Sequence, residues 1–128
     1  MPQSFACVYV HFVWSTKNRE PLITLDLSVR LYPFLGGVVR ERGCVLSHVG
    51  GMPDHVHLLV SLGRTLSVAE LVRDIKSVSS QWVHTEFPAM QQFAWQAGYG
   101  AFGVSLSNVA DVRKYIDGQA DHHRVVTF

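Results

Sequence analysis

The chain has 128 residues, of which 48% are hydrophobic and 16% charged, and its formal net charge is +1. This length and composition are typical of one domain with a buried core, and they exclude a disordered chain. The near-zero charge excludes a global basic surface of the kind that binds duplex DNA, so any contact with nucleic acid has to come from a local site.

The N-terminal part of the chain predicts a strand, a polar loop and a helix. Residues 5–14 are rich in β-branched and aromatic side chains, and both faces of this strand are mostly apolar. Such a strand is covered on both sides, by helices or by a partner subunit. The loop that follows carries the cations Lys17 and Arg19. A helix is then predicted over residues 26–42, although Pro33 weakens that prediction.

The middle of the chain predicts a hairpin and a second helix. Residues 44–49 and 55–62 are expected to form two antiparallel strands, because the Gly-Gly-Met-Pro-Asp segment between them is strong turn chemistry. Ser67 is a good N-cap, and Glu70 completes a capping box with it. The helix that starts there is expected to end near residue 86, before a proline.

The last part of the chain predicts a short strand and a third helix. The strand is expected near residues 102–106, and Asn108 is expected to cap a helix from residue 109 to about 122. The element order is then β-α-β-β-α-β-α. It indicates an α+β fold of the ferredoxin-like or RRM-like kind: a split β-α-β sandwich with an antiparallel sheet and an added C-terminal helix. We expect a single domain over residues 1–128.

The two cysteines and the N-terminus point to one cellular compartment. Cys7 and Cys44 lie inside apolar runs, which is typical of reduced core cysteines in a cytosolic protein, with a bridge between them as the alternative. The first residues lack the pattern of a signal peptide, and no apolar stretch is long enough to span a bilayer. We therefore expect a soluble, cytoplasmic protein without a membrane partner.

The segment from residue 53 to residue 62, Pro-Asp-His-Val-His-Leu-Leu-Val-Ser-Leu, contains two histidines separated by one residue. Side chains alternate along a strand, so His55 and His57 project side by side from one face and both can reach one metal ion. The opposite face is apolar and suits burial under the helices. A His-x-His pair by itself is weak evidence, since many such pairs are structural or exposed.

A tyrosine and a glutamine share one face of the last predicted helix. Tyr115 and Gln119 are four residues apart, so they lie one above the other. Taken alone, this pair is more typical of a half-buried tyrosine beside a surface glutamine. Together with the histidines it describes a phosphodiester-cutting site, which needs a nucleophile and a cation that polarises the phosphate. A phenol with a pKa of about 10 needs help to lose its proton.

Three segments of the chain carry a resemblance to a known family. They are VHFVWSTKNREP, GGMPDHVHLLVSL and YIDGQADHH, in this order. Over nearly the whole chain, from about residue 9 to residue 123, the sequence resembles the TnpA transposases of the "insertion sequence two hundred" family. These are HUH-type single-tyrosine transposases, and the REP-associated tyrosine transposases are their close relatives.

The resemblance implies a DNA transposase that cleaves and rejoins single-stranded DNA at hairpin-forming insertion-sequence ends. His55 and His57 would be the histidines of the HUH motif, and Gln119 would be the third ligand of a magnesium or manganese ion. Tyr115 would attack the DNA and form a 5′-phosphotyrosine, leaving a 3′-hydroxyl. The resemblance also implies a homodimer in which each active site combines the histidines of one subunit with the tyrosine helix of the other.

Four cations are candidates for DNA contacts. Lys17 and Arg19 follow the first strand in a loop that the resemblance includes, and they are candidates for gripping a phosphate. Arg73 and Lys76 lie on the polar face of the second helix, where a solvated surface is at least as good an interpretation.

Three residues near the C-terminus have open roles. His122 and His123 belong to the motif and are candidates for supporting the metal site, touching DNA or capping the helix. Gly118 falls inside the predicted helix, either as a soft spot or as a tolerated glycine.

Two other functions remain as alternatives. One is a catalytically idle protein that binds single-stranded or hairpin DNA on the same scaffold. The other is a zinc-dependent hydrolase that uses His55 and His57 and does not need Tyr115.

Overall fold

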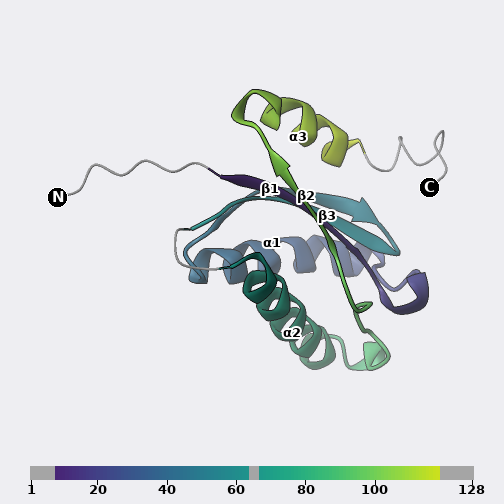
Figure 1. The fold of residues 1–128 in the computed structure, drawn as a ribbon. Helices are drawn as coiled ribbons and strands as arrows, with labels where there is room; N and C mark the ends of the chain where they lie inside the picture. The colour runs from purple at the N-terminus through teal and green to yellow at the C-terminus, as the bar shows by residue number, and fades with distance from the viewer. Residues whose placement is uncertain (1–7, 64–66, 119–128) are drawn as a thin grey trace.

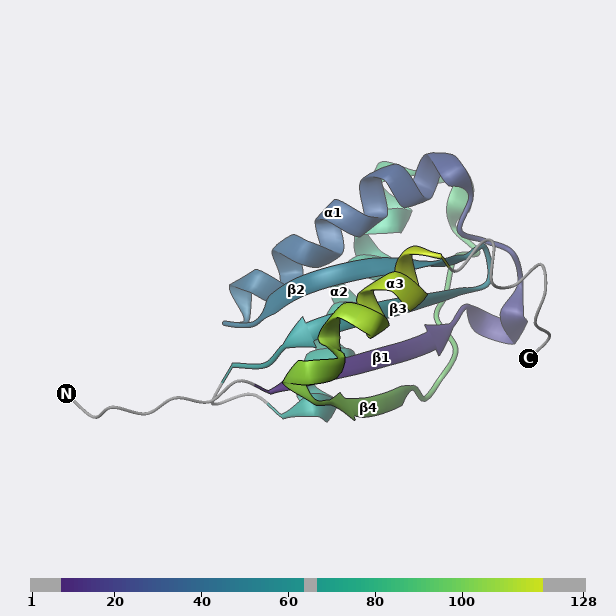
Figure 2. The ribbon, with the colours of Figure 1, turned by 90° about the horizontal axis from the view of Figure 1, so that it is seen from above.

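The computed structural model describes residues 8–63 and 67–118, and it has an antiparallel four-stranded sheet in the order β2-β3-β1-β4 (Figure 1). Helices α1 and α2 cover one face of this sheet, and α3 lies on the opposite face, as the view in Figure 2 also shows. The elements are β1 (Tyr9–Ser15), α1 (Leu25–Glu41), β2 (Val45–Met52), β3 (His55–Ser61), α2 (Val68–Glu86), β4 (Gly100–Val104) and α3 (Val109–Asp117). The predicted α+β fold is confirmed.

Side chains along β1 point alternately to the two faces of the sheet, one packed on α1 and α2 and the other on α3. Val10, Phe12 and Trp14 are buried beneath α1 and α2, and they lie opposite apolar residues of β3 in the antiparallel register. The intervening side chains, including His11, face α3. Both faces of the strand are therefore covered by helices of the same chain, which is one of the two arrangements that its apolar pattern predicts.

The hairpin between β2 and β3 is tighter than its glycines indicate. Gly50 and Gly51 were expected in the turn, but they stay paired with His57 and Val56, and only residues 53–54 turn. The glycines serve close packing: a Cβ on Gly50 would lie 2.8 Å from the backbone oxygen of Ile116. Strand β2 therefore runs three residues further than predicted, because Gly50 makes room for α3 and Gly51 for the close backbone of β3 rather than for a turn.

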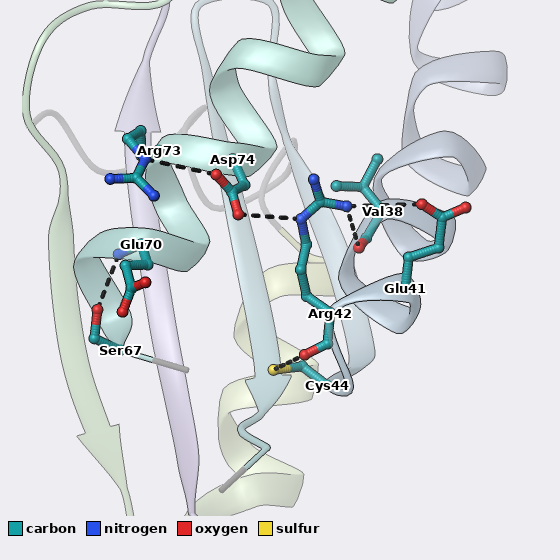
Figure 3. Close-up of polar contacts among 8 residues, drawn as sticks. All are labelled: Val38, Glu41, Arg42, Cys44, Ser67, Glu70, Arg73 and Asp74. Atoms are coloured by element: carbon teal, nitrogen blue, oxygen red, sulfur yellow. Dashed lines mark hydrogen bonds and ion pairs between the residues drawn. The ribbon is translucent and has the colours of Figure 1, made fainter. Parts of the chain in front are cut away.

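Side-chain caps and ion pairs hold the two large helices. The Ser67 hydroxyl accepts a hydrogen bond from the Glu70 backbone N–H at 3.1 Å, as the capping pattern predicts (Figure 3). Near the same end of the helical layer, Arg42 follows the last turn of α1 and contacts Asp74 of α2 at 3.3 Å, and at the other end Arg30 of α1 contacts Glu86 of α2 at 2.8 Å. Pro33 is accommodated inside α1.

The last strand and helix differ from the sequence prediction at their ends. Strand β4 begins at Gly100 and ends at Val104, two residues earlier than expected. The side chain of Asn108 makes no capping hydrogen bond, and a 3₁₀ turn precedes α3 instead. Helix α3 ends at Asp117 rather than near residue 122, and Gly118 is its C-cap rather than an interior residue. A helix commonly stops at such a glycine.

The structure bears on the predictions about the cysteines and about membrane-spanning segments. Cys44 is buried and has a free thiol, whereas Cys7 lies outside the described residues, so the alternative of a bridge is not tested. Within residues 8–63 and 67–118, no helix has the length and apolar character needed to cross a bilayer.

Candidate active site

Strand β3 presents two buried histidines to the face of the sheet that α3 covers. The imidazole rings of His55 and His57 have centroids 5.0 Å apart and lie nearly perpendicular to each other. Their exposed fractions are 6% and 5%, unusually low for a titratable side chain. The alternation of the strand thus brings together the two residues that the sequence pattern pairs.

Helix α3 places Tyr115 against these histidines within the same chain. The ring centroids of Tyr115 and His57 are 5.5 Å apart, with the rings at 85°. The helix is docked by Ile116, which is 1% exposed and packs with Val109 on Leu59 of β3. One residue of the helix is therefore buried to hold it, and the preceding residue is aimed at the histidine site.

Polar contacts at the outer side of α3 fix the helix to β2. The Arg113 guanidinium donates two hydrogen bonds to the Ser47 hydroxyl, at 3.1 and 2.9 Å. His48 lies 3.2 Å from the carboxylate of Asp117. These contacts restrain the helix at two successive turns, and so restrain the position of the tyrosine ring.

Each histidine of the pair has a defined partner at its Nδ1 atom. His55 Nδ1 is 2.7 Å from Asp54 Oδ1, and the other carboxylate oxygen of Asp54 is 3.1 Å from the Arg19 guanidinium. His57 Nδ1 is 2.9 Å from His11 Nε2. Such partners set the tautomer and orientation of metal-binding histidines, and they make Nε2 the nitrogen suited to a metal.

The pKa values of the two partners are both lowered. Burial lowers the pKa of His11, so this imidazole is held neutral beside His57. Burial raises the pKa of Asp54, but the hydrogen bond and charge of His55, together with Arg19, outweigh that effect and bring it below its ordinary value. An ionised Asp54 supports the Nδ1–H tautomer of His55.

The donor set fits a divalent cation with open coordination positions. Two imidazoles leave room for the phosphate oxygens and waters that a catalytic metal needs. Among the described residues, no group of three or more His, Cys, Asp or Glu side chains could hold a metal ion. Gln119, the expected third ligand, lies outside those residues, as do His122 and His123.

A cavity of about 720 Å³ opens beside the histidines and the tyrosine. Aromatic and small residues dominate its lining, and Arg19 is the cation among the lining residues. The lining consists of His11, Val13, Trp14, Ser15, Arg19, His55, His57, Ala97, Gly98, Tyr99, Phe102 and Tyr115.

The four cations proposed as DNA contacts occupy different places. Lys17 and Arg19 belong to one 3₁₀ turn, Lys17–Arg19, of which Arg19 lines the cavity and Lys17 does not. Arg73 and Lys76 belong to α2, on the opposite side of the sheet from α3. The Lys76 ammonium donates hydrogen bonds to the carbonyl oxygens of Gln96 and Gly98, so its contacts are structural.

Sequence reasoning missed several residues of the site. His11 lies in the predicted first strand, where a histidine between apolar residues is more often a core residue than part of a site. The alternation of β1 was a usable signal, but its pairing with β3 was needed to bring His11 beside His57. Tyr99 and Phe102 lie in a segment with no motif, and only the folded chain brings them to the cavity.

The fold is the α+β fold of solved transposases. A crystal structure of a Deinococcus radiodurans R1 protein described as a transposase superposes with a TM-score of 0.76, at 23% identity, over 93% of this chain and 95% of that chain. The REP-associated tyrosine transposase bound to a REP hairpin gives a TM-score of 0.63, at 17% identity, over 97% of this chain and 72% of that one.

The sequence places the chain in one family of these enzymes. The family model described as "Transposase IS200 like" matches residues 4–119, and the chain belongs to this transposase family. The ISDra2 transposase TnpA of Deinococcus radiodurans is 26% identical over 116 residues, which are 87% of this chain and 83% of that protein. The family that the sequence motifs indicate is therefore confirmed.

Proposed function

We propose that this transposase cleaves and rejoins single-stranded DNA at insertion-sequence ends through a covalent link to Tyr115, with the help of a divalent cation. The observation that carries the proposal is the packing of the Tyr115 ring against His57, 5.5 Å between centroids, in the cavity that His55 also lines. A nucleophile and two metal-binding side chains then face one reacting phosphate.

The proposed reaction exchanges one phosphodiester bond for another and needs no outside energy source. The Tyr115 oxygen attacks the scissile phosphorus, a P–O bond forms to the phenol, and the bond to the 3′-oxygen breaks. The phenol loses its proton to solvent, and the 3′-oxygen gains one from solvent. One phosphate ester replaces another, so a 3′-hydroxyl can later attack the 5′-phosphotyrosine and rejoin strands without ATP.

The remaining residues hold and orient the reacting groups. His55 and His57 would hold the cation through Nε2, with Gln119 as the third ligand that the family resemblance implies, and magnesium or manganese as the ion. When bound, the cation polarises the phosphate. Asp54 and His11 fix the two imidazole rings through their Nδ1 atoms. Arg19, at the cavity wall, is placed to contact a DNA phosphate.

Support for the DNA partner comes from a relative. The REP-associated tyrosine transposase with this fold is bound to a REP hairpin. We therefore propose hairpin-forming single-stranded ends as the substrate. From the family resemblance we also propose a homodimer that shares its active sites between subunits as the functional state.

The first test is a covalent-adduct assay. The protein is mixed with magnesium and single-stranded oligonucleotides copied from the DNA that flanks its gene, and SDS-resistant protein–DNA adducts are separated on a gel. Wild type should form the adduct and Tyr115→Phe should form none, because the phenylalanine ring keeps the packing but lacks the nucleophilic oxygen. Tyr32→Phe, the same change on α1, is the matched control and should behave as wild type.

Two results would contradict the proposal. Hydrolysis of DNA that survives Tyr115→Phe would favour a metal-dependent hydrolase with water as the nucleophile. Binding of the oligonucleotides by wild type without any adduct would favour an idle DNA-binding protein.

A further inference from the structure

The cavity beside Tyr115 is larger than a phosphate and a cation need. Its volume of about 720 Å³ lies in the range of roughly 300–1,000 Å³ that encloses small organic ligands. The histidines and Tyr115 line one part of it. Tyr99, Phe102 and the small residues at positions 97 and 98 also line it, and the proposed chemistry has no use for them.

Phe102 is an exposed aromatic side chain next to the candidate active site. It lies directly opposite His11 in the pairing of β1 with β4, so it shares the sheet face of the histidines. The ring centroids of Phe102 and His11 are 6.3 Å apart, and Phe102 is 58% exposed. A large aromatic residue in this setting is a typical surface for stacking a planar ligand.

The backbone around Phe102 is shaped to carry its ring. A Cβ on Gly100 would come within 2.9 Å of Val13 Cγ1 and 3.0 Å of Phe102 Cε2. The glycine therefore leaves the space in which the Phe102 ring lies, along the strand rather than away from it. This is a close-approach role for a glycine in an edge strand.

Lys76 anchors the segment that brings Tyr99 to the cavity. Its ammonium donates to the carbonyl oxygens of Gln96 and Gly98, and it lies 5.6 Å from the Trp14 ring centroid. Burial lowers the pKa of this lysine. The half-buried Lys76 thus holds two carbonyls of the segment that leads to Tyr99, and Tyr99 remains 42% exposed.

We propose that Phe102 is the stacking surface of a subsite for an unpaired nucleobase of the nucleotide next to the scissile phosphate. The inference rests on the proposed function and adds the substrate feature that the site grips. Arg19 is the cation among the lining residues, so a second phosphate would find no further positive side chain there. A neutral planar ring can instead stack on the aromatic lining. Stacking tolerates any base, so the subsite holds the strand without reading its sequence.

The test follows a fluorescent base along the strand. Single-stranded oligonucleotides copied from the DNA flanking the gene each carry one 2-aminopurine, whose fluorescence falls when it stacks on an aromatic ring. The full chain carries Tyr115→Phe, so no strand is cut during the measurement. Quenching is expected at one position or two neighbouring ones, and Phe102→Leu should restore the fluorescence. Loss of one stacked base should weaken binding roughly 5- to 150-fold.

Matched variants separate stacking from apolar contact and from folding. Tyr99→Leu should give a smaller loss than Phe102→Leu, because the Tyr99 ring lies 6.5 Å from that of Phe12, on the face of β1 that α1 and α2 cover. Val45→Ala removes an exposed apolar side chain from β2, the opposite edge strand, and should leave binding and quenching unchanged.

The outcomes distinguish the subsite from the proposed function. No quenching at any position, or quenching that persists in Phe102→Leu, overturns the subsite even if wild type forms the covalent adduct. Quenching that Phe102→Leu abolishes, in a protein that forms no adduct, supports the subsite and contradicts strand transfer.

Discussion

His11 lies beside both His57, a candidate metal ligand, and Tyr115, the candidate nucleophile. Its Nε2 atom is 2.9 Å from His57 Nδ1, and its ring centroid is 6.2 Å from that of Tyr115. Because burial lowers its pKa, it meets His57 as a neutral imidazole that either donates or accepts one hydrogen bond. At this scale it is a positioning residue that decides which nitrogen of His57 points at the cation site.

Replacing His11 should therefore weaken metal binding before it affects folding. His11→Ala is expected to lower the affinity for Mn²⁺ about 10- to 100-fold, as losses of partners to metal-binding histidines do. Electron paramagnetic resonance of free Mn²⁺ measures this directly, without DNA. His11→Gln should recover part of the affinity, since its amide can still hydrogen-bond to Nδ1.

The control for this change is a second histidine with a backbone partner. His84 bonds the carbonyl oxygen of Phe93 at 2.8 Å and does not line the cavity, so His84→Gln should leave Mn²⁺ affinity as in wild type. Equal affinities for wild type and His11→Ala would refute the positioning role.

At the scale of elements, α3 can approach the sheet closely because β2 carries a glycine under it. A Cβ on Gly50 would lie 2.8 Å from the Ile116 carbonyl oxygen and 3.0 Å from its Cγ2 atom. Backbone cannot give way as a flexible side chain does. Any residue other than glycine at this position must push the helix that carries Tyr115 away from the histidines.

Gly50→Ala should therefore separate catalysis from folding. A shift of about 1 Å costs roughly 100-fold in a well-positioned reaction, so adduct formation should fall by about that factor while binding of single-stranded DNA persists. Gly37→Ala is the matched control, because nothing lies within 4 Å of its added Cβ in α1. It should keep the adduct and raise the free energy of unfolding by about 0.5–1 kcal/mol, measured by urea titration. An undiminished adduct in Gly50→Ala would show that the helix has room to spare.

The elements were largely predictable because their signals are local. The alternation of β1, the Ser67 cap and the His-x-His pattern each reside in a few neighbouring residues. The errors arose where the reason for a residue lies elsewhere in the fold. In the sequence Gly50 is typical of a turn, and only the position of α3 above it explains the glycine. Phe102 belongs to no motif, and only the pairing of β4 with β1 brings it beside His11. The ligand role of Gln119 stays a prediction.

For the whole molecule, the question is which chain supplies the tyrosine. Within one chain Tyr115 packs on its own His57, and a short 3₁₀ turn over Leu106–Asn108 joins β4 to α3. The same docking contacts would be made equally well by the helix of a second copy, as in an exchange of identical elements. The shared-site dimer requires such an exchange.

Mixing two inactive variants tests this arrangement. Tyr115→Phe and His57→Ala each lack a component of the site, but a shared-site heterodimer restores one complete site from the two wild-type halves. An equimolar mixture, unfolded and refolded together, should form about a quarter of the wild-type adduct, because half the dimers carry one complete site out of two. A mixture as inactive as its parts would assign each site to a single chain.

The attachment of α3 has a consequence for how the domain opens. Three fully or nearly buried residues, Leu59, Val109 and Ile116, hold this helix in a cluster separate from the main core, where α1 and α2 pack. A small cluster of this kind forms its own cooperative unit, whose local unfolding costs less free energy than global unfolding. In deuterium exchange, the amide of Ile116 should lose protection well before that of Ile75 in α2; simultaneous loss would show a single unit. The nucleophile would then reside on the part of the molecule that detaches most readily, and one protomer could release its tyrosine to another while the sheet and its two large helices stay folded.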